Sequence, residues 1–333
     1  MRKSIFLGTM IALLVIAFST VPSFAKTTLR FAGITPLEQS DSQRAVRFCE
    51  RIAQETNGEI EIKYYPASQL GDYTLIYEEL MRGTIDIGMV PLVSQFDPQF
   101  AICSTSFIAK DYNDVRKLFS DGGFIYEKTR ELNDKKGVKF MGFNVKGFGG
   151  LGLVDEPASV LDPTVDKKLL IRTSPNDILK LSLESMKYRT VTIPWSDLYT
   201  AMQTGVCDGW IGGTAEDNYA SMRDVIKYYY ELNIYVEALT FLMSEKAWNS
   251  LSDEHKAIFQ NAFNDAAAES MSSAEAVSKE NRDKMREYGI KVFEYNQEEL
   301  TPLFNNGREF VWKQLTDILG QDTINEMFKY VNQ

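Results

Sequence analysis

Hydrophobic and polar positions follow two different periods along the first third of the chain. Residues 27–32 and 59–65 alternate with a period of two, which is typical of half-buried strands. Residues 41–56 and 73–81 instead place apolar side chains three and four positions apart, which predicts amphipathic helices. Residues 85–90 form a short apolar run of the kind found in buried strands. This order of strands and helices predicts a parallel sheet with covering helices.

The rest of the chain continues in the same α/β style. Further strands are predicted over residues 138–145, 169–171, 191–193, 206–211, 225–230, 239–244 and 290–295. Further helices are predicted over residues 112–119, 124–135, 214–222, 299–319 and 322–331.

One helical pattern is unusually long. It opens at Ser252, keeps apolar residues on one face and stops at Gly289. Its roughly 36 residues would span ~54 Å at 1.5 Å per residue. Such a helix is longer than a small domain and could pack along one side of two domains. The alternative is two helices broken near residues 270–273.

The stretch 169–213 has the most informative local chemistry. Its first strand delivers Arg172 into a loop of small polar residues, and a guanidinium keeps its charge and needs planar acceptors. After the next strand, Pro194 and the following residues start a short helix, for which Ser196 is the expected cap. Gly205 is expected to stop that helix. The loops lie beyond strand ends, where open α/β sheets bind ligands.

The apolar face predicted for that short helix consists of Leu198, Tyr199, Met202 and Val206.

The N-terminus has the features of an export signal. Arg2 and Lys3 precede an apolar run too short for a membrane span, and a small-x-small motif ends at Ala25. We therefore expect a periplasmic or secreted protein that starts near Lys26. An uncleaved anchor is the alternative.

Charge and composition exclude several classes of function. The 36 basic and 46 acidic residues give a net charge of −10, which makes nucleic acid or an anionic membrane a poor partner. The three cysteines, Cys49, Cys103 and Cys207, have apolar neighbours and fit small buried side chains, although one disulfide stays open. The single histidine, His255, fits a helix surface better than a catalytic role.

A glycine-rich segment at residues 146–152 matches the dinucleotide-binding fingerprint in its letters. The fingerprint requires a helix to open at the glycines, whereas residues 151–154 are predicted to be extended. We therefore interpret the segment as a crossing between two domains, with glycines that allow a close approach.

These pieces together resemble the solute-binding proteins of tripartite ATP-independent periplasmic (TRAP) transporters, in their dicarboxylate-binding branch. The similarity covers nearly all of residues 28–330, and its matching segments are LRFAGITP, YYPASQLGD, MRGTIDIGMV, LLIRTSPND, IPWSDLYTAMQTGVCDG and FLMSEKAWNSLSDEHKAIF.

The resemblance implies a periplasmic-binding-protein-like α/β fold with two domains, crossing strands and a long bracing helix. It also implies an organic-acid ligand and a membrane permease as partner, with no enzymatic activity, cofactor or metal. We expect one domain to comprise residues 26–145 and about 238–275, and the other residues 146–237 and about 276–333.

The same resemblance implies that Arg172 grips the ligand carboxylate through two parallel hydrogen bonds. The alternative is a surface arginine paired with an acid. The other positions expected at the ligand are Trp210, Gly212, Trp195, Phe148, Gly149, Lys146, Pro91, Ile34 and Tyr73.

Some positions depart from the family pattern. Gly149 stands where many members have arginine, and Trp210 to Gly213 stand where many have an amide-bearing QENP. Ile34 and Pro91 replace polar residues of some relatives. These changes favour a monocarboxylate with an apolar or aromatic body. In the alternative, the tryptophans pack in the core and Lys146 supplies a second positive charge for a dicarboxylate.

Two other functions stay open from sequence. A ligand receptor for a signalling partner would have the same cleft. A secreted hydrolase or lyase would need a nucleophile–base pair or a metal set, for which the single histidine and the missing G-x-S-x-G motif give little support.

Overall fold

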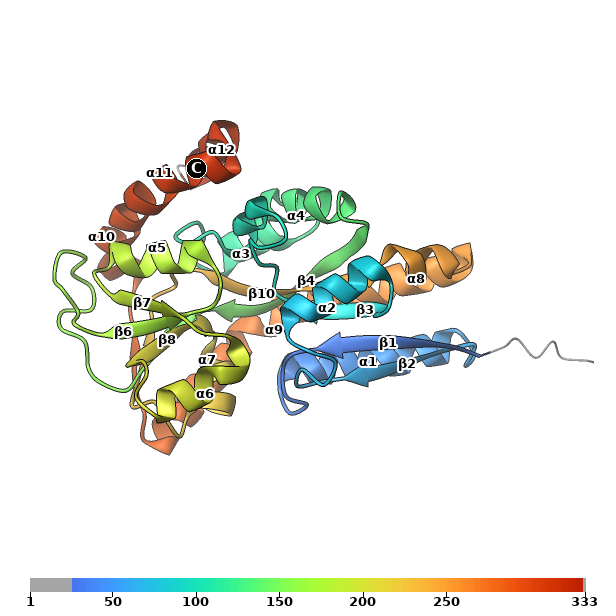
Figure 1. Cartoon of the computed structure of the whole chain (residues 1–333), viewed down its shortest axis with the longest axis horizontal. Coiled ribbons are helices and arrows are strands. Elements are labelled where there is room, and N and C mark those ends of the chain that lie inside the picture. The colour runs from blue at the N-terminus through green and yellow to red at the C-terminus, as the bar shows by residue number, and fades with distance from the viewer. Residues whose placement is uncertain (1–25, 332–333) are drawn as a thin grey trace, which may run out of the picture.

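The computed structural model describes residues 26–331. Within this range the strands form a five-stranded and a six-stranded sheet, which occupy different ends of an elongated molecule (Figure 1). The expected leader, with its cleavage site near Ala25, lies outside the described residues. Among the residues described, none of the helices is long and apolar enough to span a membrane.

The first sheet contains the N-terminal part of the chain and has the strand order β2-β1-β3-β10-β4. Its strands are β1 (Thr27–Gly33), β2 (Ile60–Tyr65), β3 (Ile87–Val90), β4 (Val138–Phe148) and β10 (Val236–Ser244). The strands β1, β2 and β3 are parallel, as predicted. β10, which was not part of that prediction, runs antiparallel to both β3 and β4, so the complete sheet is mixed. The reason is that β10 enters from the opposite end of the molecule.

The second sheet has the order β11-β9-β5-β8-β6-β7. Its strands are β5 (Gly150–Leu153), β6 (Leu170–Thr173), β7 (Arg189–Thr192), β8 (Gly209–Gly213), β9 (Tyr228–Glu231) and β11 (Lys291–Glu294). β6 lies parallel to both β7 and β8, while β5 is antiparallel to β8 and β9.

Helices cover both sheets. Those of the first part of the chain are α1 (Ser40–Glu55), α2 (Tyr73–Arg82), the 3₁₀ segment η1 (Pro98–Ser104), α3 (Tyr112–Phe119) and α4 (Phe124–Asp134). Those around the second sheet are α5 (Asp177–Ser185), α6 (Trp195–Gln203), α7 (Ala215–Asp217) and the π-helical turn η2 (Asn218–Met222). The remaining ones are α8 (Glu245–Ser250), α9 (Asp253–Tyr288), α10 (Gln297–Gly307), the π-helical turn η3 (Arg308–Trp312), α11 (Lys313–Leu319) and α12 (Gln321–Val331).

Two neighbouring strands connect the sheets. β4 leads from the first sheet through Phe148 into β5 of the second, and β9 leads back into β10. The two crossings are paired with each other, with Val236 opposite Phe148 and Glu237 opposite Gly147. The register shifts between Glu237 and Ala238. The glycine-rich segment is therefore extended, as predicted, and β5 stands where a dinucleotide fingerprint would need a helix.

Helix α9 is continuous over 36 residues, so the alternative of two broken helices is wrong. Ser252 caps its first turn by accepting a hydrogen bond from the His255 backbone, and Gly289 ends it at φ 101°. Phe263 packs in the core of the first sheet, where its ring lies 4.4 Å from that of Phe48 in α1. Met285 belongs to a core cluster of the second sheet. One helix thus spans both sheets.

Two expectations around α6 are wrong. Pro194 precedes the helix and no side chain caps it, because Ser196 directs its hydroxyl to Asp197 Oδ1 at 3.3 Å. Tyr199 and Val206, expected on the apolar face, are exposed. The strands β8 and β9 also begin at residues 209 and 228 rather than at 206 and 225.

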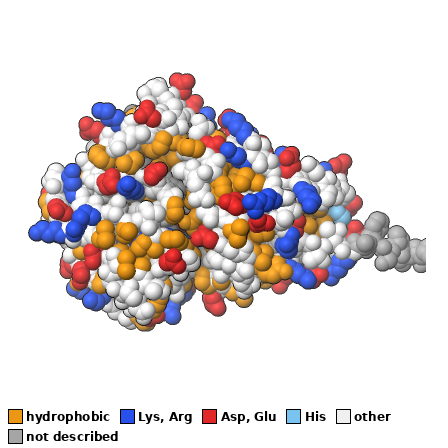
Figure 2. Space-filling view, in the orientation of Figure 1, with side chains coloured by type: hydrophobic (Ala, Val, Ile, Leu, Met, Phe, Trp, Pro, Cys, Tyr) orange, Lys and Arg blue, Asp and Glu red, His pale blue; other side chains and the backbone are white. Residues whose placement is uncertain are grey.

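All three cysteines are free thiols in the structure, which leaves no support for a disulfide. Cys103 and Cys207 are buried, and Cys49 is partly buried. On the face shown in Figure 2, basic and acidic side chains are interspersed rather than gathered by sign.

Candidate functional site

A small cavity lies between the two sheets, beyond the ends of several strands. Its volume, counted as the space that the centres of water molecules can occupy, is about 70 Å³. The first sheet and its loops supply Ile34, Tyr73, Pro91, Leu92, Val93 and Ser104. The second sheet and the crossing supply Arg172, Ser174, Asn176, Leu179, Trp195, Gly212, Tyr235 and Glu237. The position agrees with the general rule that open α/β sheets bind ligands outside their strand ends.

Arg172 is the buried cation of this cavity. It is the third residue of β6, and 2% of its surface is exposed. Its Nε donates a hydrogen bond to the Ile193 carbonyl at 2.7 Å, which fixes the plane of the guanidinium. Burial lowers the pKa of Arg172 from its usual value.

No carboxylate among residues 26–331 forms an ion pair with Arg172, so the alternative of a surface arginine paired with an acid is not what the structure contains. A buried charge without a partner costs several kcal/mol. The arrangement therefore suits an anion that enters from outside.

Six of the ten positions expected at the ligand line this cavity. They are Arg172, Trp195, Gly212, Pro91, Ile34 and Tyr73. The other four, Trp210, Phe148, Gly149 and Lys146, lie behind its wall.

The two tryptophans have different positions. Trp195 faces the cavity, and its ring centroid lies 5.6 Å from that of Trp210. Trp210 is fully buried and donates from Nε1 to Asn218 Oδ1 at 3.0 Å. Phe148 is also buried, in edge contact with Tyr112 at 5.1 Å. Trp210 and Phe148 thus support the wall from the core.

The glycines near the site do not leave the free space that their small size suggested. A Cβ at Gly149 would stand 2.1 Å from the Tyr235 ring, and a Cβ at Gly213 would stand 2.2 Å from Trp210. Aromatic rings therefore fill the volume that these glycines release. Gly212 differs, because its φ of 129° needs glycine and its would-be Cβ stays 3.4 Å from the nearest Arg172 nitrogen.

Lys146 forms the centre of a buried ion cluster. Its Nζ donates to Asp217 Oδ1 at 2.6 Å and to Gln39 Oε1 at 3.0 Å, and lies 3.5 Å from Asp41 Oδ2. Burial alone would lower the pKa of Lys146, but the two carboxylates and Glu216 outweigh it and raise the pKa. The charge of Lys146 is therefore already compensated within the protein.

The same region joins the two sheets directly. The backbone nitrogen and hydroxyl of Ser40, at the start of α1, donate to the Glu216 carboxylate of α7 at 2.7 and 2.8 Å. Gln39 and Asp41 reach Lys146 from the same turn. These contacts hold one side of the cavity together without any ligand.

Sequence reasoning missed two polar groups of the cavity, Tyr235 and Glu237. Both belong to a segment that was interpreted only as a crossing. The sequence did contain a signal for Glu237, because an acidic residue shortly before the apolar run of the strand predicted at residues 239–244 is unusual. Burial, followed by the nearby Asp217 carboxylate, raises the pKa of Glu237 to about 8, although Lys146 and Arg172 act in the opposite direction.

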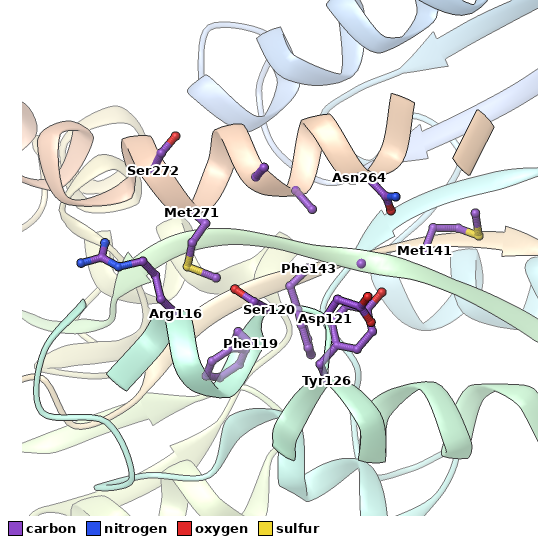
Figure 3. A pocket seen from close by; sticks show the side chains of 13 residues that line it. Arg116, Phe119, Ser120, Asp121, Tyr126, Met141, Phe143, Asn264, Met271 and Ser272 are labelled. Carbon is purple, nitrogen blue, oxygen red and sulfur yellow. The ribbon is translucent and has the colours of Figure 1, made fainter. Parts of the chain in front are cut away.

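A larger hollow of about 590 Å³ lies on another face, between α3, β4 and α9 (Figure 3). Phe119, Phe143 and Met271 contribute its apolar surface. Arg116, at its edge, is exposed and donates to Asn113 Oδ1 at 2.8 Å. This arginine is therefore solvated, unlike Arg172, and the hollow lacks the desolvated cation of the smaller cavity.

The residues on which the alternative of a hydrolase or lyase would depend can be located in the structure. Among the described residues, no group of three or more His, Cys, Asp and Glu side chains could hold a metal ion. His255 lies on α9 with Nε2 3.5 Å from Glu59 and is not part of the cavity wall. Two sheets, paired crossings, a long bracing helix and a buried cation between the lobes define a periplasmic-type binding protein.

The comparisons with known proteins agree with this class. The chain belongs to the bacterial extracellular solute-binding protein family 7, whose family pattern matches residues 31–316. This family consists of binding proteins rather than enzymes.

Relatives and solved structures resemble the chain over nearly its full length. The C4-dicarboxylate-binding periplasmic protein DctP of Rhodobacter capsulatus is 22% identical over 316 residues, which cover 92% of this chain and 91% of the relative. A TRAP periplasmic solute-binding protein from Desulfovibrio salexigens, solved with bound orotic acid, has a TM-score of 0.82 at 19% identity, covering 92% of this chain and 99% of that one. A TRAP protein from Sulfurospirillum deleyianum with bound succinate has a TM-score of 0.81 at 20% identity, covering 91% and 99%. These likenesses confirm the predicted fold.

Proposed function

We propose that this protein captures a small organic-acid anion in the cavity between its sheets and delivers it to the membrane subunits of a TRAP-type permease. The observation that carries the proposal is Arg172, a buried guanidinium with two nitrogens free to face a ligand carboxylate across the cavity. Two parallel charge-assisted hydrogen bonds would satisfy it. The carboxylate ligands named for solved relatives, orotate and succinate, support the ligand class.

We also propose a periplasmic location, with residues 1–25 as a cleaved leader. The periplasmic naming of the Rhodobacter relative and the charge pattern of that segment support it. Mass spectrometry of the exported protein would test the cleavage. A mature chain that still contains Arg2 and Lys3 would contradict it.

The two lobes are proposed to close on the ligand by a hinge at residues 145–147 and 235–238. In this division residues 26–145 and about 238–275 move as one domain, and residues 146–237 and about 276–333 move as the other. The paired crossings and the register shift after Glu237 support this position. X-ray scattering should show a more compact particle with ligand, and identical dimensions would contradict closure.

Within the organic acids we propose a monocarboxylate with a small apolar body. Ile34, Leu92, Val93 and Trp195 give the cavity an apolar wall. Lys146, the expected second cation for a dicarboxylate, is held by Asp217 and Asp41 instead. The volume corresponds to roughly five to seven water-sized positions, which favours a ligand of few heavy atoms.

Two measurements test these proposals separately. A thermal-shift screen followed by calorimetry compares succinate, malate, 2-oxo acids, branched monocarboxylates and aryl acids, since a ligand of the folded state raises Tm. Tight binding of succinate or malate alone would overturn the monocarboxylate proposal. For transport, uptake into vesicles that contain candidate permease subunits should require the added protein. Uptake that proceeds equally without it would overturn the transport proposal.

A further inference from the structure

Glu237 is an acidic side chain in the wall of a cavity whose other charged group is Arg172. It is the second residue of β10, at the crossing between the sheets and opposite Gly147. Within residues 26–331 no basic side chain forms an ion pair with its carboxyl. The cavity therefore presents a guanidinium and a carboxyl group, neither of them in ion-pair contact with a partner among the described residues.

Lys146, the basic group that acts most strongly on Glu237, is already paired with other acids. Lys146 contributes attraction, but its ammonium is bound to Asp217 at 2.6 Å and lies 3.5 Å from Asp41. Glu216 adds a third acid to this cluster. At Glu237 itself, the Asp217 carboxylate opposes a further negative charge. A second ligand carboxylate is disfavoured there, and a cation is favoured.

The charged and titratable groups around Glu237 act on its carboxyl in opposite directions. Asp217 from α7 opposes its ionisation, while Lys146 from β4, Arg172 from β6 and the Tyr235 hydroxyl favour it. The Tyr73 hydroxyl of α2 is also within electrostatic reach. Tyr235 is 3% exposed, and its hydroxyl acts on the Glu237 carboxyl as a hydrogen-bond donor of poor geometry.

We propose that Glu237 is a specificity-determining residue, and that the ligand is a small zwitterion of the amino-acid type with its carboxylate on Arg172 and its ammonium on Glu237. The inference rests on the proposed function, because it needs Arg172 as the carboxylate site. Such a ligand places its carboxylate against the buried Arg172 and its ammonium against the Glu237 carboxyl, which it stabilises in the ionised form. A simple carboxylic acid would leave Glu237 without a cation.

A proton accompanies this binding mode. Because burial and Asp217 raise the pKa of Glu237 to about 8, the free protein at pH 7 mostly holds the carboxyl protonated. An ammonium stabilises the carboxylate, so binding at pH 7 releases most of one proton to the buffer. Affinity for the zwitterion should rise as the pH increases from 6 towards 8. An anion without the ammonium should show no such rise.

The test uses matched ligands on one carbon skeleton: small aliphatic 2-amino acids, their 2-hydroxy and 2-oxo analogues, and the unsubstituted acids. Calorimetry on the full-length mature protein compares wild type, Glu237→Gln and Arg172→Ala. Glu326→Gln, an exposed acid on α12, is the matched control. Circular dichroism and Tm establish that each variant is folded.

We expect wild type to bind one of the amino acids at least tenfold more tightly than its hydroxy analogue. Glu237→Gln should weaken amino-acid binding at least 30-fold, change binding of the other acids less than threefold, and abolish proton release measured in two buffers of different ionisation enthalpy. Arg172→Ala should lose both ligand types, and Glu326→Gln should lose neither.

Each of the remaining outcomes contradicts either the zwitterion proposal or the proposed function. Equal affinity of Glu237→Gln for the amino acid, tight binding of deaminated acids alone, or no binding by any amino acid overturns the zwitterion proposal. In those cases, loss of acid binding by Arg172→Ala still supports the proposed carboxylate site. Unchanged binding by Arg172→Ala overturns the proposed function itself.

Discussion

Replacing Arg172 by alanine should abolish ligand binding and leave the protein folded. In wild type the guanidinium is buried and uses only Nε within the described protein, for the Ile193 carbonyl. Truncating one partner of a buried charge pair costs on the order of 2–5 kcal/mol or more, because the other charge stays desolvated. Since 1.4 kcal/mol is a factor of ten, affinity should fall by roughly 30-fold to several thousand-fold.

The effect of Arg172→Ala on the ligand-free protein should be much smaller. The substitution removes a hydrogen bond to the Ile193 carbonyl, at a cost of about 1–3 kcal/mol if that oxygen stays unsatisfied. It also removes a desolvated charge that has no ion-pair partner, which is stabilising. The two contributions oppose each other, so Tm without ligand should change little. A binding site with an unpaired buried charge lowers the stability of the ligand-free protein and increases its affinity for a ligand of opposite charge.

Calorimetry and thermal shift with the best ligand of the screen measure both effects. Arg189→Ala is the matched control, since Arg189 lies on the adjacent strand β7 but is exposed. Arg172→Lys should also lose much affinity, because an ammonium cannot make two parallel bonds to a carboxylate. If Arg172→Ala binds within twofold of wild type, the carboxylate site is elsewhere and the reasoning fails.

Three further substitutions test other parts of the site. Gly149→Arg should destabilise the protein and weaken binding, because even its Cβ would stand 2.1 Å from Tyr235; thermal denaturation that matches wild type would contradict this. Lys146→Met should lower the unfolding free energy by about 3–5 kcal/mol, because Asp217 keeps a buried charge without its partner; urea denaturation measures it, and a change below 1 kcal/mol would be inconsistent with a buried pair. Glu237→Gln should stabilise the ligand-free protein increasingly from about pH 5 to pH 8, by at most about 1.4 kcal/mol per pH unit. The folded pKa of about 8 exceeds the unfolded value, so the wild-type folded state binds more protons and loses stability as the pH rises through this range. A Tm difference between the two proteins that does not depend on pH would refute that assignment.

The fold was predictable because its main signals are local. The 36-residue helix α9 follows from one apolar face between Ser252 and Gly289, both of which act as the sequence predicts. Alternation in β1 and β2 and the apolar run of β3 likewise give the parallel part of the first sheet. The antiparallel insertion of β10 could not be predicted in this way, since it depends on where a strand from the far end of the molecule returns.

Six of the ten positions predicted from sequence line the cavity, and Arg172 is the charged one among them. Arg172 combines a charge, a strand end and a family motif, and it lines the cavity. Trp210 lies behind the wall, because side-chain direction depends on tertiary packing, and Gly149 lies against the Tyr235 ring. Glu237 and Tyr235 were missed, since their importance comes from facing Arg172 across two sheets, and no spacing in the sequence reports that distance.

The contacts on each side of the cavity have different consequences for closure. Ser40 with Glu216, and Lys146 with Asp217, join the two sheets through groups that are compensated within the protein. They favour contact between the two lobes whether or not a ligand is bound. They therefore influence the proposed equilibrium between open and closed forms on which a ligand acts. Arg172 acts in the opposite sense, since its guanidinium is buried without an ion-pair partner among the described residues. A ligand can drive closure only by its differential affinity for the closed state. Under the hinge closure proposed above, the ligand carboxylate would supply that difference by compensating Arg172, so we expect charge complementarity as well as apolar fit to govern selection.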